Sequence, residues 1–236
     1  MSMSAKPNQL KLFVAAAGLL GLLLRLVLLE TALDEKGLLV SGHWADVGVW
    51  LLTAAVIGMI CLFVGRCPQP EPRKTALPGC IGALIAACGF ILSGGSADTT
   101  VRLAAAEPVL KILAAAALIA VAYCRFRGKK PSFLLHGTVC LYLALRMVCR
   151  YQIWSADPQL QHYAFYLGAH VAVMLGCYQQ TALDAGSGDR RSLWRWYLAA
   201  VYLCLTALPG SEDPFFLLCC GIWMLSNLCG SAAEGD

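Results

Sequence analysis

The sequence has few charged residues and contains none of the motifs that mark common enzyme sites. Only 14% of its 236 residues are Asp, Glu, Lys or Arg, and 59% are hydrophobic. A soluble domain normally has about a quarter charged residues. H-E-x-x-H, G-x-S-x-G, the Walker lysine loop and G-x-G-x-x-G do not occur. We therefore expect a membrane protein rather than a soluble enzyme, and assign no catalytic residue.

Metal and redox motifs are also missing, although the chain contains 12 cysteines. No C-x-x-C occurs. Most of the cysteines lie inside long apolar stretches, where cysteine behaves as a small hydrophobic residue. We therefore expect no metal site and no cofactor.

The apolar residues are gathered in blocks of the length that a membrane-spanning helix needs, which is roughly 20 residues for a bilayer core of about 30 Å. The blocks cover residues 10–30, 45–65, 79–95, 105–125, 132–152, 160–182, 193–209 and 214–229. Alternation with period two is absent, and lipid leaves no backbone group unpaired, so the blocks are predicted helices. We predict an all-α integral membrane protein, a single membrane domain over 1–236 with about eight transmembrane helices. Because the last two blocks are short, a re-entrant pair that leaves six spans is the alternative.

Proline positions agree with these helix boundaries, because a missing N–H group costs nothing in the first turn of a helix. Five prolines lie close to the start of a block: Pro78, Pro108, Pro131, Pro158 and Pro214. Three more stiffen residues 66–79, which we predict to be an extended cytoplasmic linker.

Basic residues are concentrated in every second predicted connection, as the positive-inside rule requires of a multi-pass protein. One set of connections contains 12 Lys and Arg, and the other set contains 3: Lys36, Arg102 and Arg150. We predict cytoplasmic N- and C-termini in the plasma (inner) membrane, with an uncleaved first span. The net charge of +4 thus reflects topology and does not indicate nucleic-acid binding.

Short matches between the two halves of the chain raise the hypothesis of a duplication. Residues 22–27 resemble residues 143–148, and two further short matches follow in the same order. The halves would be residues 10–125 and 132–229, two parallel four-helix repeats related about the membrane normal. The alternative is chance similarity between leucine-rich segments.

Ionisable side chains inside apolar blocks are the best pointers to function, because each costs about 2.5–3.5 kcal/mol near the bilayer centre. The predicted spans carry a group of them in their outer halves, which we take as a candidate polar cavity with a positive balance: Arg25, Glu107, Lys111, Arg146, Arg150, His162 and His170. The alternative for the arginines is snorkelling to the interface, and for Glu107 and Lys111 an interfacial helix start.

Three functions remain open on these observations. A small transporter or permease subunit for an anionic solute or a lipid headgroup fits the positive cavity. A scaffold or partner subunit of another membrane complex fits the small residues on the predicted helix faces. An intramembrane lipid-modifying enzyme has only the His and Glu residues of the predicted spans in its favour. The expected partners are the lipid bilayer, an anionic small molecule or lipid, and another membrane protein.

Overall fold

The computed structural model is helical almost throughout the part of the chain that it describes, which comprises residues 7–32, 43–65, 71–72, 77–94, 105–154 and 163–232. The helices are α1 (Pro7–Thr31), α2 (Trp44–Val64), α3 (Leu77–Leu92), α4 (Glu107–Phe126), α5 (Phe133–Trp154), α6 (Ala164–Asp184), α7 (Arg190–Ala207) and α8 (Pro214–Cys229). Two-residue strands β1 (Glu71–Pro72) and β2 (Ser231–Ala232) form an antiparallel pair. The prediction of an all-helical fold is confirmed.

Four of the helices within the described residues are long and apolar enough to cross a membrane, namely Asn8–Thr31 of α1, α2, α4 and Phe133–Gln152 of α5. Helices α3 and α8 are apolar but have only 16 residues each. The membrane assignment is therefore supported, and eight spans stay a prediction.

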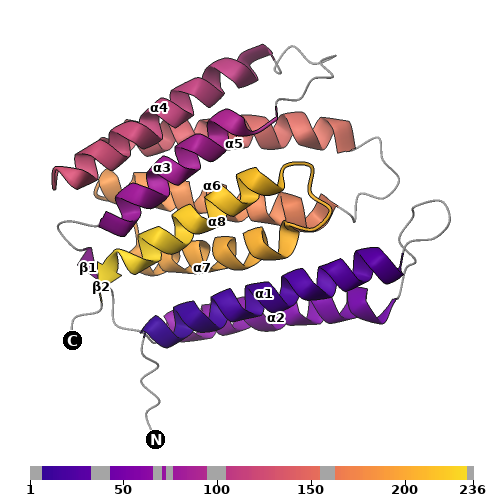
Figure 1. The fold of residues 1–236 in the computed structure, drawn as a ribbon. Helices are drawn as coiled ribbons and strands as arrows, with labels where there is room; N and C mark the ends of the chain where they lie inside the picture. Colours follow the sequence, from indigo (N-terminus) through magenta and orange to yellow (C-terminus); the bar gives the residue numbers. More distant parts are fainter. Residues whose placement is uncertain are drawn as a thin grey trace, which may run out of the picture.

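Helices α3 to α8 form one bundle, in which each helix packs against the next and α8 closes the bundle by packing against α3 (Figure 1). The hairpin of α1 and α2 lies along α7 at the edge of this bundle (Figure 1). Aromatic side chains such as Tyr142, Phe216 and Trp223 are wholly buried in the bundle interior.

Several helices begin where proline predicts. Pro7 and Pro214 are the first residues of α1 and α8, and Pro78 and Pro108 are the second residues of α3 and α4. Pro158 lies outside the described residues. Helix α3 begins at Leu77, inside the range predicted as linker, because Pro78 suits a first turn.

Close backbone approach holds α3 against α8. A Cβ atom on Gly89 would lie 2.5 Å from the Cβ atom of Cys219, and one on Gly82 would lie 3.2 Å from the Cα atom of Trp223. Only glycine leaves room for helices this close, which is the packing mode expected in lipid.

The two halves of the chain are not packed alike. Helix α6 packs closely on α7, whereas in the described residues their counterparts under the predicted duplication, α2 and α3, do not pack closely on each other. The duplication therefore stays a prediction about the sequence, without matching packing in the two halves.

Candidate functional site: a buried polar network

Arg146 of α5 is the centre of a polar cluster at the end of the bundle that the sequence assigns to the outside. Its side chain is wholly buried. The guanidinium group forms ion pairs with Glu107 at the start of α4, at 3.4 Å, and with Asp213 just before α8. Its Cζ atom lies 4.5 Å from the centre of the Phe216 ring. Two other segments of the bundle thus supply carboxylates to one arginine.

Arg150 lies one turn further along α5 and shares a partner with Arg146. Its Nη2 atom donates to Asp213 Oδ2 at 2.9 Å, and its Nη1 atom donates to Glu212. Asp213 Oδ2 also accepts from Nη2 of Arg146. A single carboxylate oxygen therefore bridges the two guanidinium groups.

The end of α3 supplies backbone acceptors for the same cations. The Gly94 carbonyl accepts from Arg146 at 3.2 Å and from Arg150 at 3.3 Å. Lys111 of α4 donates to the Ser93 carbonyl at 2.5 Å. These carbonyls lie past the last turn of α3, where the helix leaves its final C=O groups without intrahelical partners.

Hydroxyl groups complete the coordination of Arg146. Its Nη1 atom donates to Tyr142 Oη at 3.1 Å and to Ser93 Oγ at 3.3 Å. We call the whole set the outer network: Ser93, Gly94, Glu107, Lys111, Tyr142, Arg146, Arg150, Glu212 and Asp213. The buried guanidinium has hydrogen-bond partners from four segments, as a charge out of water requires.

The outer network contains three cations, Lys111, Arg146 and Arg150, and three carboxylates. The positive balance expected from the sequence is not found, because Glu212 and Asp213 fold back from the connection between α7 and α8. The arginines are also enclosed by the protein and do not face an open cavity, since Arg146 is 0% and Arg150 only 8% exposed.

His170 of α6 adjoins the outer network through an aromatic ring. Its imidazole stacks on Phe216 with 5.2 Å between ring centres, and Phe216 also contacts Arg146. His170 Nδ1 lies 3.1 Å from the Tyr166 carbonyl oxygen. The Nε2 atom is buried and has no hydrogen-bond partner within the described part of the chain.

Arg25 and His162 are not placed in the outer network. The guanidinium of Arg25 in α1 lies over the ring of Phe165 in α6, 5.0 Å from its centre. It is also electrostatically attracted to Asp46 at the start of α2. His162 lies outside the described residues. Of the seven predicted site residues, Glu107, Lys111, Arg146 and Arg150 come together, and His170 adjoins them.

A second polar cluster, which the sequence analysis missed, lies at the opposite end of the bundle. His136 Nδ1 is 2.8 Å from Asp184 Oδ2, and both side chains are buried. Arg125 donates to Asn227 at 2.5 Å. We call this set the inner network: Arg125, His136, Gln180, Asp184, Tyr197 and Asn227. The sequence feature that could have indicated this cluster is His136, a histidine only four residues into an apolar block.

The chemistry open to the outer network is recognition of an oxyanion. Two guanidinium groups that share one carboxylate oxygen offer the planar donor geometry that carboxylates and phosphates bind. Within the described residues, no group of three or more His, Cys, Asp or Glu side chains is arranged to hold a metal ion.

Comparison of the chain with protein-family models, with curated proteins and with solved structures finds no match in any of the three.

Proposed function

We propose that the chain is a small membrane carrier that binds the anionic group of its substrate at the outer network, through Arg146 and Arg150. The observation that carries the proposal is the position of Asp213 Oδ2, which accepts from both guanidinium groups. This tethered carboxylate occupies the place that the carboxylate or phosphate of a substrate would take. Substrate then binds by displacing it.

The segment that supplies this carboxylate is a short, partly exposed connection between two helices. Glu212 and Asp213 lie in the short connection between α7 and α8, which turns at Gly210 with a φ of 71°. The Asp213 side chain is 14% exposed and that of its neighbour Glu212 is 38% exposed, whereas the Glu107 side chain, on the other side of Arg146, is 3% exposed. We therefore assign the exchangeable role to the α7–α8 connection and a fixed role to Glu107.

The inner network supports a carrier by giving the bundle a second closure. A carrier opens its binding site to one side of the membrane at a time, so each end needs a contact that can break. The His136–Asp184 pair joins α5 to α6 at the inner end, and the Arg125–Asn227 bond joins α4 to α8. Apolar side chains, among them Leu143 and Cys177, fill the bundle between the two networks.

The test measures anion binding without knowledge of the natural substrate. Purified protein in mild detergent is heated with phosphate, citrate or glutamate, at an ionic strength kept constant with chloride, and its unfolding temperature is read from tryptophan fluorescence. A ligand that binds only the folded state raises this temperature. We expect Asp213→Asn to respond at lower anion concentration than the parent protein, because the tethered competitor has lost its charge.

The matched arginine variants complete this test. Arg150→Gln should lose the anion response. Arg125→Gln, which removes an arginine of the inner network, should keep it. The carrier proposal is wrong if Asp213→Asn responds to these anions no more than to chloride, or if Arg150→Gln and Arg125→Gln respond alike.

A further inference from the structure

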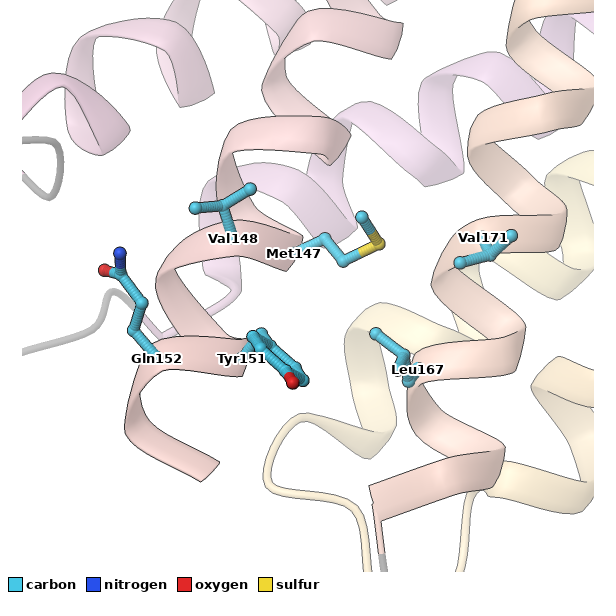
Figure 2. A pocket seen from close by; sticks show the side chains of 6 residues that line it. All are labelled: Met147, Val148, Tyr151, Gln152, Leu167 and Val171. Carbon is cyan, nitrogen blue, oxygen red and sulfur yellow. The ribbon is translucent and has the colours of Figure 1, made fainter. Parts of the chain in front are cut away.

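A groove of about 410 Å³ lies between α5 and α6 near the outer network. Figure 2 shows the residues that line it, with the α5 and α6 side chains on either side of the gap: Met147, Val148, Tyr151, Gln152, Leu167 and Val171. Val148 and Tyr151 are 41% and 47% exposed, so the groove opens away from the bundle interior. Its lining is apolar apart from the tips of Tyr151 and Gln152.

The medium that fills this groove follows from the place of α5. Phe133–Gln152 is one of the helices able to cross a membrane, and the groove lies along its last described turns. A groove open sideways at this depth faces hydrocarbon and not water. Acyl chains are therefore the natural occupants, with Tyr151 and Gln152 at the end nearest the interface, where amphipathic side chains belong.

The groove and the arginines lie on neighbouring faces of the same helices. Met147 follows Arg146 in the chain and Tyr151 follows Arg150. On α6, Val171 likewise follows His170. Consecutive residues of an α-helix differ by about 100° in direction. Each of these groove residues therefore lies beside a residue that belongs to the outer network or adjoins it. The groove and the outer network are at the same depth in the membrane.

We propose that the outer network takes its anion as the headgroup of an anionic phospholipid, with one acyl chain in the α5–α6 groove. This inference rests on the proposed function and names its substrate class. A chain held in the groove keeps its phosphate at the level of Arg150, which raises the local concentration of the anion beside the guanidinium groups. A soluble anion would gain nothing from the groove.

The experiment compares three ligands on purified, delipidated protein by native mass spectrometry and by unfolding temperature. They are phosphatidylglycerol, phosphatidylcholine with the same acyl chains, and inorganic phosphate. We expect phosphatidylglycerol to bind more tightly than phosphatidylcholine by about tenfold, which corresponds to 1.4 kcal/mol. Arg150→Gln should remove this preference, because it removes a positive charge that favours the anionic headgroup over the zwitterionic one.

Variants that fill the groove separate the chain from the headgroup. Val171→Trp should weaken phosphatidylglycerol binding by about tenfold and leave the response to inorganic phosphate unchanged, which also shows that the variant is folded. Met147→Trp is a second groove-filling variant. The matched control is Leu141→Trp on the outward face of α5, two turns from the groove, where the side chain is 57% exposed.

Each outcome distinguishes the two proposals. If Val171→Trp and Met147→Trp bind phosphatidylglycerol as the Leu141→Trp control does, the lipid inference is overturned. If inorganic phosphate still binds and depends on Arg150, the substrate is a soluble anion and the carrier proposal stands. If neither phosphate nor phosphatidylglycerol binding depends on Arg150, both proposals fail.

Discussion

Arg146 shows at the scale of one residue how a membrane bundle accommodates a charge. A guanidinium group buried without partners would be prohibitively costly, so the surrounding segments must supply carboxylates, carbonyls and hydroxyls. Glu107 and Asp213 do so from two directions. The arginine therefore fixes the relative positions of α4, α5 and the start of α8.

Glu107→Gln tests this role, because it removes the charge of a buried partner while keeping its size. We expect it to lower the free energy of unfolding by about 2 kcal/mol, the scale of a hydrogen bond to a charged group. The measurement is helical circular dichroism during SDS titration in mixed micelles. The control, Glu212→Gln, alters a partly exposed carboxylate and should cost under about 1 kcal/mol. Equal losses for the two variants would contradict the assigned difference in burial.

Residues of the outer network differ in how far the sequence reveals them. Arg146, Glu107 and Lys111 stand out because an ionisable group in an apolar block is costly and needs a reason. Asp213 and Glu212 lie in a connection, where acidic residues are ordinary, so their contact with the arginines emerges only when the fold brings the α7–α8 connection beside α5.

At the scale of one helix, the boundaries could be predicted because local chemistry fixes them. Proline begins α1 and α8. Asp189 caps α7 by accepting from the N–H groups of Arg191 and Ser192, each at 3.1 Å. Capping of this kind depends on residues adjacent in the chain, so it is visible before the fold is known.

The partner of each helix depends instead on matching surfaces. Gly82 with Ala86 marks one face of α3 as small, but nothing in the sequence says that this face meets α8 rather than α2. The close approach of Gly89 to Cys219 shows that α8 is the partner of this face.

Gly89→Ala tests the close approach. The added Cβ atom would lie 2.5 Å from the Cβ atom of Cys219, so α3 and α8 must separate. We expect a loss of about 1–3 kcal/mol in the free energy of unfolding, measured by SDS titration. Gly58→Ala in α2, where nothing lies within 4 Å of the added atom, should be neutral or slightly stabilising. A Gly89→Ala protein as stable as the Gly58→Ala control would refute the tight contact.

For the whole molecule, composition reveals the membrane class and the apolar blocks reveal the helices along the chain. Neither reveals how the helices pack against one another. The predicted halves, residues 10–125 and 132–229, would each form a four-helix unit. In the described residues α3 and α4 join α5 to α8 in one bundle, and α1 and α2 lie along α7, so the division into halves stays a prediction. Lipid provides no hydrophobic drive that favours one neighbour over another, so packing detail selects the arrangement.

Topology is tested with reporters fused at successive connections. If α7 and α8 both span, a fusion after Gly186 should report the cytoplasm and a fusion after Ser211 the outside. The charge pattern, with Arg190 and Arg191 at the start of α7, predicts this alternation. A cytoplasmic signal from the Ser211 fusion, with a full signal from a control fusion after Gly186, would show that the last two helices do not cross.

The shortness of α3 and α8 has a consequence for the surrounding membrane. Sixteen residues make a helix of about 24 Å, several ångströms less than the roughly 30 Å of hydrocarbon in an ordinary bilayer. The two short helices pack against each other, so the mismatch is concentrated on one side of the molecule. If both helices cross the membrane, lipid there must compress, which would favour thin bilayers and bring the headgroup layer down toward Ser93 and Asp213.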